Sequence, residues 1–246
     1  MTIEESDVRL AERLAREAGE ILLALQNQGD LSGKELGQAG DARANELLMR
    51  ELKIARPEDA ILCEEEKDSD ARLSASRVWI VDPLDGTREY SEGRSDWAVH
   101  VALSIGGIAT VGAVALPALD LTLTSAGPPK LKALNTPLKM LVSRTRPAAE
   151  AVAVAKILGA DLLPMGSAGA KAMAVVRGEA DVYLHTGGQY EWDNCAPVAV
   201  AEAAGLYCAR IDGSPMRYNA PDGYLPDLVI CHPELEDAVK AAIAAL

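Results

Sequence analysis

The stretch VWIVDPLDGTREYSEG, residues 78–93, runs an apolar strand segment into two aspartates, a proline and a glycine. Proline fixes φ and glycine frees it, so we expect a sharp turn that begins at Asp82. The turn would bring Asp82, Asp85 and the Leu84 carbonyl to one side. Two carboxylates about 4 Å apart repel by roughly 4 kcal/mol at an effective dielectric of 20, so they need a proton or a cation. Oxygen ligands without His or Cys favour Mg²⁺ or Mn²⁺ over zinc.

The same residues also fit an Asp-Pro and Asp-Gly surface turn. An EF-hand loop does not fit, because Gly86 comes too early and Leu84 occupies its third position. The haloacid-dehalogenase motif separates its two aspartates by a single residue, whereas two residues intervene here. Further acidic residues favour the metal site: residues 64–66 are glutamates after a short strand, and Asp193 stands at a helix start. Taken singly, these would be surface glutamates and a helix N-cap.

The chain has 246 residues and a formal net charge of −13, which argues against binding to nucleic-acid polymers or membranes. A small anion would need locally placed cations. The four cysteines lack a C-x-x-C pair, which argues against a zinc cage or a disulfide framework and favours a reducing cytoplasm. The acidic start of the sequence, without a long apolar run behind it, is not expected to be a secretory signal. The uncharged segment 98–119 is long enough to span a membrane, but its β-branched residues and Gly106-Gly107 predict a hairpin of two buried strands.

Periodicity predicts two parts with a boundary after residue 126. In residues 1–126 we expect helices at 2–25, with Thr2 and Glu5 as a capping box, and at 41–55, joined by a polar linker over 29–40. Strands follow at 60–63, 78–81, 98–116 as a hairpin, and 121–124. After a proline-rich connector, residues 127–246 alternate between strands (139–143, 161–164, 181–184, 206–211) and helices (148–158, 167–177, 193–204). Such alternation builds a sheet flanked by helices.

Three motifs occur in a characteristic order: a strand followed by glutamates, then DPLDGT, then WDNCAP. This combination resembles the inositol monophosphatase-like superfamily of lithium-sensitive, metal-dependent phosphatases, and the resemblance covers almost the whole chain. It implies an α/β fold, a five-layer αβαβα sandwich, as a monomer or a homodimer. The N-terminal part would carry most metal ligands, and the C-terminal part would carry Asp193 and the substrate-binding residues.

The resemblance also implies roles for individual residues. Two or three Mg²⁺ ions, with Mn²⁺ as a substitute, would be bound by Glu64, Asp82, the Leu84 carbonyl, Asp85 and Asp193. Glu64 could share the third, more loosely bound ion. Thr87, paired with Asp41, would orient the attacking water and help to deprotonate it. Two alternatives stay open: Cys63 and a third glutamate leave Glu65 as a competing ligand, and Asp41 could cap its helix.

A helix start at Gly166 and Ser167, with Lys171 one turn later, offers N–H groups and a cation to an anion. Arg144 and Arg146 follow a strand and suggest recognition of a second phosphate. The competing interpretation is a plain N-cap, a solvated lysine and a solvated loop. Cys195 and the histidines at 100, 185 and 232 receive no catalytic role, although His185 could contact a ligand.

The pieces GSAGAK, GGQYEWD, LVSRTR and DPLDGTREYSEG look most like the branch that hydrolyses 3′-phosphoadenosine 5′-phosphate, the CysQ type, in sulfur assimilation. The partner would be a small phosphorylated metabolite, which loses its 3′-phosphate at the metals to give AMP. The implied substrate-binding residues are Gly86, Thr87, Ser143, Arg144, Arg146, Gly166, Ser167, Lys171, Gly188, Gln189, Tyr190 and Trp192, of which the last four line the nucleoside side. Inositol phosphates and fructose 1,6-bisphosphate remain alternative substrates. A phosphoenzyme formed on an aspartate and a nucleotide-sensing module without turnover are the other hypotheses.

Overall fold

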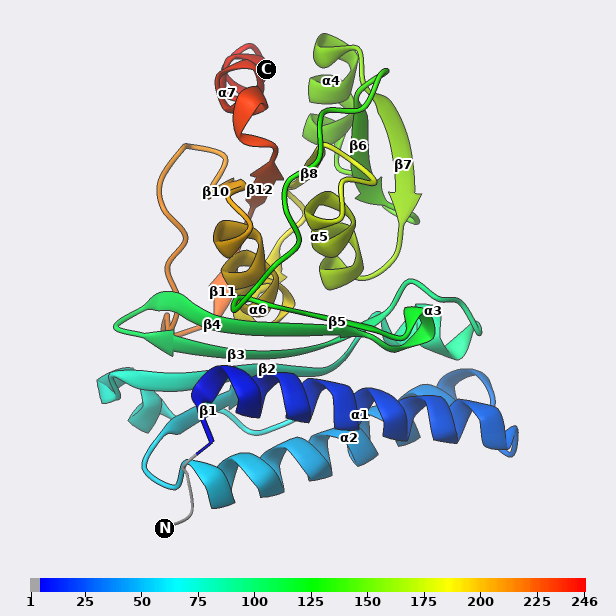
Figure 1. The fold of residues 1–246 in the computed structure, drawn as a ribbon, viewed down its shortest axis with the longest axis vertical. Coiled ribbons are helices and arrows are strands. Elements are labelled where there is room, and N and C mark those ends of the chain that lie inside the picture. The colour runs from blue at the N-terminus through cyan, green and yellow to red at the C-terminus, as the bar shows by residue number, and fades with distance from the viewer. Residues whose placement is uncertain (1–4) are drawn as a thin grey trace.

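The computed structural model describes residues 5–246, which stack as alternating layers of helices and sheets (Figure 1). A pair of long helices covers the first sheet, two helices lie between the sheets, and two more cover the second sheet on its far side. This arrangement is the αβαβα sandwich, so the predicted fold is confirmed. Within the described part of the chain, no helix is both long and apolar enough to cross a membrane.

The first outer layer consists of α1 (Asp7–Gln28) and α2 (Gly33–Ala55), which pack against each other. The N-cap of α1 is Ser6, whose hydroxyl accepts the Arg9 N–H. The predicted capping box is therefore wrong for Glu5, which precedes the helix, and Thr2 lies outside the described residues.

The second helix begins earlier than predicted and includes most of the expected linker 29–40. The reason is close packing at its glycines. A Cβ atom on Gly37 would lie 2.7 Å from Ser91 Oγ, and one on Gly40 would lie 3.0 Å from the Tyr90 ring. Glycine costs about 1 kcal/mol in a helix interior, and here the close contacts with other elements offset that cost.

The first sheet has the order β1-β2-β3-β4-β5, in which β1 and β2 are parallel and the other pairs are antiparallel. The predicted hairpin is confirmed, with Gly106 and Gly107 both at positive φ in its turn. A short helix, α3 (Thr87–Ser91), follows β2 directly. The strands are β1 (Ala60–Cys63), β2 (Arg77–Asp85), β3 (Ala98–Ile105), β4 (Ile108–Leu116) and β5 (Leu121–Thr124).

The middle layer consists of α5 (Ala168–Val176) and α6 (Glu191–Ala203), which pack on the first sheet on one side and on the second sheet on the other. A Cβ atom on Gly112 of β4 would lie 2.5 Å from the Ala196 carbonyl oxygen, so glycine lets α6 lie close to the sheet. Consequently, the first turns of both helices lie near the end of β2, where the DPLDGT motif is found.

The second sheet has the order β10-β12-β8-β6-β7, and its far side is covered by α4 and α7. We did not predict β12, α7 or the small sheet of β9 and β11. Their bounds, with those of the other elements after residue 126, are β6 (Lys139–Ser143), α4 (Ala149–Leu158), β7 (Asp161–Met165), β8 (Val182–His185), β9 (Gln189–Tyr190), β10 (Tyr207–Ala209), β11 (Tyr224–Leu225), β12 (Leu228–Cys231) and α7 (Glu236–Ala244). Short 3-10 helices cover Asp70–Ser74, Pro117–Leu119 and Pro233–Leu235.

Candidate active site

Three aspartates meet where the first sheet faces the middle helices. Asp82 and Asp85 come from the end of β2, and Asp193 comes from the first turn of α6. Each offers an oxygen atom that lies within 4.8 Å of the other two. We call these three residues the acidic cluster. The fold thus brings together carboxylates that are far apart in the sequence, as a metal site requires.

A bulge at the end of β2 turns two of these aspartates to the same side. Asp82 lies opposite His100 of β3 and Asp85 lies opposite Ala98, so β2 has one residue more than its partner here. Side chains alternate along a regular strand, and one extra residue returns positions three apart to a common face. The strand therefore does not end before Asp82 in a sharp turn, as predicted, but continues through Asp85.

The first turn of α5 binds Asp85. The Oδ2 atom of Asp85 accepts the Ser167 hydroxyl and, at 2.7 Å, the Gly169 N–H; its Oδ1 atom accepts the Ala168 N–H at 3.1 Å. Burial alone would raise the pKa of Asp85, but nearby His100 and these hydrogen bonds outweigh it and lower the pKa to about 2. The structure differs from the prediction here, because the N–H groups expected to bind a substrate anion bind a carboxylate of the protein.

In the other two carboxylates of the acidic cluster, Asp82 and Asp193, hydrogen bonds do not offset the effect of burial and neighbouring charges on the pKa. Burial, followed by the charge of Glu64, raises the pKa of Asp82 well above its usual range. Burial and the charge of Asp85 raise the pKa of Asp193 to about 6, although the Tyr190 N–H donates to Asp193 at 2.7 Å. A hard divalent cation prefers such oxygen ligands and would relieve the repulsion, so the residues fit a metal site.

The glutamates after β1 face different parts of this site. The carboxyl group of Glu64 hydrogen-bonds with Asp82, and desolvation followed by the charge of Asp193 raises its pKa to about 7. Glu64 keeps a large accessible surface, and its hydrogen bond with Asp82 opposes the rise of its pKa. Glu65 instead acts on the pKa of Asp41. This geometry favours Glu64 over Glu65 as a metal ligand.

Asp41 and Thr87 lie together beside the acidic cluster. The Thr87 hydroxyl donates to the Leu84 carbonyl at 3.1 Å and also hydrogen-bonds with Asp41. Burial and the charge of Glu65 raise the pKa of Asp41 to about 7, against the effect of Thr87. Asp41 lies inside α2, so the alternative that it caps a helix is wrong. A carboxylate with this pKa can accept a proton near neutral pH.

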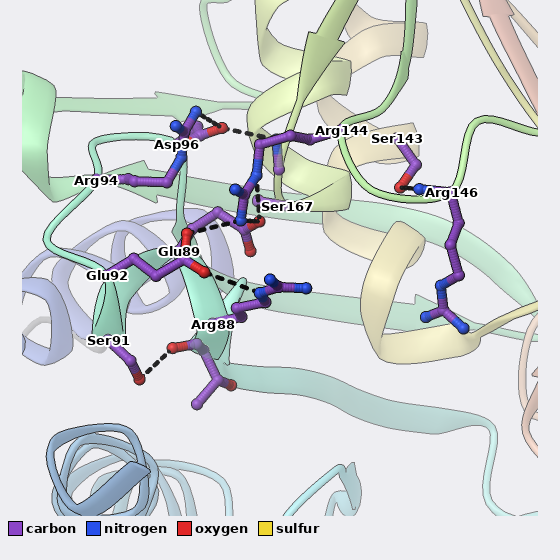
Figure 2. A network of polar contacts seen from close by, with 12 residues as sticks. Arg88, Glu89, Ser91, Glu92, Arg94, Asp96, Ser143, Arg144, Arg146 and Ser167 are labelled. Atoms are coloured by element: carbon purple, nitrogen blue, oxygen red, sulfur yellow. Dashed lines mark hydrogen bonds and ion pairs between the residues drawn. The ribbon is translucent and has the colours of Figure 1, made fainter. Parts of the chain in front are cut away.

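A cavity of about 480 Å³ adjoins the acidic cluster, and most of its residues appear in Figure 2. Ser167 belongs to its wall and also binds Asp85, so the two sites share a residue. We call this cavity the cationic pocket. Its lining residues are Arg88, Glu89, Ser143, Arg144, Thr145, Arg146, Gly166, Ser167 and Lys171.

The two predicted arginines differ in their surroundings. Arg144 Nη2 lies 2.8 Å from a carboxylate oxygen of Glu89 and 2.8 Å from one of Glu92, so its guanidinium is held by two acids. Arg146 lies apart from this ion-pair network in Figure 2, and its backbone N–H donates to Ser143 Oγ at 3.3 Å. Among residues 5–246, no acidic side chain forms an ion pair with Arg146. Arg146 is therefore the more available cation.

Lys171 is 5% exposed, so the alternative of a solvated lysine is wrong. Its Nζ donates to the carbonyls of Gly166 at 3.2 Å and Ser167 at 2.6 Å and lies 5.3 Å from the centre of the Tyr183 ring. Burial lowers the pKa of Lys171, and the charge of Asp85 opposes that shift. The pocket thus has a buried amine in its wall.

The residues predicted for the nucleoside side differ in exposure: Gln189 is buried, whereas Tyr190 is exposed. The Gln189 side chain is buried, and its amide donates to Tyr183 Oη at 2.9 Å and accepts from Asn194 at 3.2 Å. Its polar atoms are thus used within the protein. Tyr190 is 45% exposed and stacks on Trp192 with ring centroids 4.7 Å apart.

Gly188 has φ of +81°, and a Cβ atom there would overlap the Tyr224 side chain. Tyr224 also meets the Tyr190 ring edge-on at a centroid distance of 5.9 Å. We did not predict Tyr224, because only the pairing of β9 with β11 brings it here. Glu89 and Asp96 were also missed; Asp96 pairs with Arg94 and accepts the Gly166 N–H at 2.6 Å. The only sequence signal for an ion-pair role of these two acids was a nearby arginine, Arg88 beside Glu89 and Arg94 close to Asp96.

Two histidines have contacts that sequence reasoning did not give. His100 is fully buried, lies 3.2 Å from Asp85 Oδ2, and has Nδ1 2.9 Å from the Trp192 carbonyl oxygen. His185 Nε2 lies 3.2 Å from the Gly188 carbonyl oxygen. The sequence signal for His100 was its place in a strand that pairs with the DPLDGT strand.

Comparisons with known proteins give the family of this chain. The family model described as the inositol monophosphatase family matches residues 4–245. The 3′-phosphoadenosine 5′-phosphate phosphatase of Mycobacterium leprae is 46% identical over 98% of this chain and 94% of its own length. The protein of the same name from Mycobacterium tuberculosis is 48% identical over 93% of this chain and 90% of its own length.

A solved structure shares the fold at low sequence identity. The structure of CysQ from Bacteroides thetaiotaomicron, a bacterial member of the inositol monophosphatase family, superimposes with a TM-score of 0.77. It is 23% identical and covers 92% of this chain and 97% of that chain. This similarity supports the five-layer fold.

Proposed function

The chain belongs to the inositol monophosphatase family, and from that premise we propose that it hydrolyses the 3′-phosphate of 3′-phosphoadenosine 5′-phosphate to AMP and phosphate. The proposed substrate is the compound after which the two mycobacterial relatives are named. The proposed reaction is that of a metal-dependent phosphomonoesterase. The proposed setting is sulfur assimilation in the cytoplasm, where the four free thiols of the chain would stay reduced.

One observation carries this proposal: an acidic cluster and a cationic pocket share Ser167. A substrate with two phosphates needs one site for the reacting group and a second site of positive charge for the other group. In a chain with a net charge of −13, cations grouped in one cavity are expected to bind an anion. A monophosphate substrate would leave the cationic pocket without a ligand.

We assign Mg²⁺ to the acidic cluster, with Mn²⁺ as a substitute. The proposed ligands are Glu64, Asp82, the Leu84 carbonyl, Asp85 and Asp193, for two or three ions. When bound, such ions neutralise the phosphate oxygens, lower the pKa of a water molecule and stabilise the leaving alkoxide.

The chain supplies proton transfer and orientation. Thr87 and Asp41 hydrogen-bond to each other, and Asp41 has a pKa of about 7, so we propose a proton relay from the attacking water to Asp41. The single hydroxyl hydrogen of Thr87 turns from the Leu84 carbonyl to Asp41, and Thr87 Oγ1 takes the water proton as Asp41 takes the hydroxyl proton. The N–H groups of Gly86 and Thr87, at the start of α3, are proposed to contact the reacting phosphate.

The other phosphate is proposed to bind in the cationic pocket, chiefly to Arg146, with Ser143, Gly166 and Lys171 in its wall. Arg144 would shape the pocket through its ion pairs, and the exposed Tyr190 ring, which stacks on Trp192, would contact the nucleoside.

The test compares kcat/KM for 3′-phosphoadenosine 5′-phosphate, inositol 1-phosphate and fructose 1,6-bisphosphate at one Mg²⁺ concentration. We expect the nucleotide to be preferred by about tenfold or more. A wide preference for either sugar phosphate would reject the nucleotide proposal. EDTA is the control and should stop phosphate release with every substrate.

Two further measurements separate the reaction from its alternatives. Hydrolysis in isotopically labelled water should place the label in phosphate, whereas label in Asp82 or Asp85 would indicate attack by an aspartate. Tight nucleotide binding without phosphate release in saturating Mg²⁺ would indicate a sensing module instead of an enzyme.

A further inference from the structure

The imidazole of His100 touches three separate segments around the acidic cluster. Its Nε2 lies 3.2 Å from Asp85 Oδ2 on β2, and its Nδ1 lies 2.9 Å from the carbonyl oxygen of Trp192, which immediately precedes Asp193 in the first turn of α6. The third segment is the first turn of α5, where a Cβ atom on Gly169 would overlap Nε2. The side chain is 0% exposed.

Both partners of the ring are hydrogen-bond acceptors. The Trp192 carbonyl can only accept, so Nδ1 carries a hydrogen and fixes the orientation of the imidazole. With the ring fixed, Nε2 faces a carboxylate. Its contact with Asp85 Oδ2, at 3.2 Å, is an ion pair and not a well-aligned hydrogen bond.

The contacts of Asp85 are divided unequally between its two oxygens. Oδ2 receives the Ser167 hydroxyl, the Gly169 N–H at 2.7 Å and the His100 ring. Oδ1 receives the Ala168 N–H at 3.1 Å. A carboxylate oxygen has about two lone-pair sites, so Oδ2 has none left, whereas Oδ1 can accept one more partner.

We propose that His100 is a positioning residue that orients the Asp85 carboxylate so that Oδ1, and not Oδ2, binds the divalent ion. The inference rests on the proposed metal-dependent function but not on the identity of its substrate. His100 itself touches neither the ion nor the substrate. Its role is to keep one carboxylate from rotating, which a metal site needs because ligand geometry is part of its affinity.

A matched pair of substitutions tests the contact. In His100→Gln the side-chain amide nitrogen can reach the position of Nε2, and in His100→Asn it can reach the position of Nδ1. Both variants are uncharged and polar, so they differ in which contact they retain and in one methylene group, whose effect on packing shows in the stability of the metal-free protein. Mn²⁺ affinity is measured by calorimetry on the full chain without substrate, and the melting temperature in EDTA reports on folding.

The expected result is that His100→Gln retains Mn²⁺ affinity within about threefold of wild type, whereas His100→Asn loses about tenfold or more. Equal affinities in the two variants would overturn the proposal, since the ring would then act only by filling space. If the substrate preference proves different, this result is unaffected, because no substrate is present.

A second measurement serves if the variants do not fold. A crystal structure of the wild-type chain with Mn²⁺ should show Asp85 Oδ1 as the ligand atom and Oδ2 still in contact with His100. Coordination through Oδ2, or loss of the His100 contact on metal binding, would overturn the proposal.

Discussion

Replacing Asp82 by asparagine should make the metal-free protein more stable, although it removes a proposed metal ligand. Asp82 is 1% exposed and lies in a group of carboxylates whose oxygens are within 4.8 Å of one another. Asparagine has nearly the same shape, and its Oδ1 can still accept the Leu84 N–H, which donates to Asp82 at 2.9 Å. The substitution therefore removes charge with little change in packing.

The size of the effect follows from the distances. Two unit charges 4.8 Å apart repel by about 3.5 kcal/mol at an effective dielectric of 20. Uptake of a proton by the cluster relieves part of this, so we expect a gain of about 2 kcal/mol in the free energy of unfolding. For a chain of this length, that is a rise of about 4–8 °C in Tm.

The pH dependence has a definite sign. Burial and neighbouring carboxylates raise the pKa of Asp82 in the folded state, so its charge destabilises the fold above the unfolded pKa of about 4. The gain of Asp82→Asn should be present at pH 8 in EDTA and vanish near pH 3, where the carboxyl group is protonated in both states.

The assay is thermal unfolding of wild type and Asp82→Asn in EDTA and in saturating Mg²⁺. Metal should raise the Tm of wild type much more than that of the variant, because ligand binding stabilises the folded state by mass action. A variant that is less stable than wild type in EDTA at pH 8, with an unchanged response to metal, would refute the reasoning.

Three further predictions follow from single contacts. Arg146→Ala should lower kcat/KM for 3′-phosphoadenosine 5′-phosphate by about 10–30-fold but leave adenosine 3′-phosphate nearly unchanged, because a charge-assisted hydrogen bond contributes roughly 1.5–2 kcal/mol; an equal loss on both substrates would contradict a role in binding the second phosphate. Asp41→Asn should lower kcat by about 100-fold and abolish the rise of kcat with pH near 7, since a general base must be unprotonated; an unchanged pH profile would assign the proton transfer elsewhere. Asp59→Asn should cost about 1–2 kcal/mol of unfolding free energy at pH 7, because hydrogen bonds from Arg77 and Trp79 lower the pKa of Asp59 against the effect of burial. Urea titrations should show the cost shrinking as the pH falls below about 4 and through the lowered folded pKa; a cost that is the same at pH 7 and at about pH 2 would exclude the ionic contribution.

The elements predicted well are those with a strong local signal. The hairpin of β3 and β4 combines β-branched residues with Gly106-Gly107, and the structure has its turn at those glycines. At the start of α2, in contrast, the local sequence indicated a linker although the structure has a helix. Gly37 and Gly40 disfavour a helix locally, and their close contacts with Ser91 and Tyr90 help to offset that cost. That information belongs to the tertiary structure and cannot be read from the segment itself.

In the candidate site, too, some features have a local sequence signal and others depend on tertiary packing. The aspartates of the acidic cluster could be predicted, because Asp82 and Asp85 belong to the DPLDGT motif and Asp193 belongs to the WDNCAP motif. It did not show that α5 binds Asp85, because the contact depends on how closely the middle layer packs on the first sheet. The burial of Lys171 and the pairing of Arg144 with Glu89 depend on the same packing.

The most direct test of the account is anomalous X-ray diffraction from crystals grown with Mn²⁺. We predict an anomalous peak between Asp82, Asp85 and Asp193, and a second one in contact with Glu64 and the Leu84 carbonyl. Mn²⁺-dependent phosphate release from a chain whose crystals show no anomalous peak among the three aspartates would contradict it.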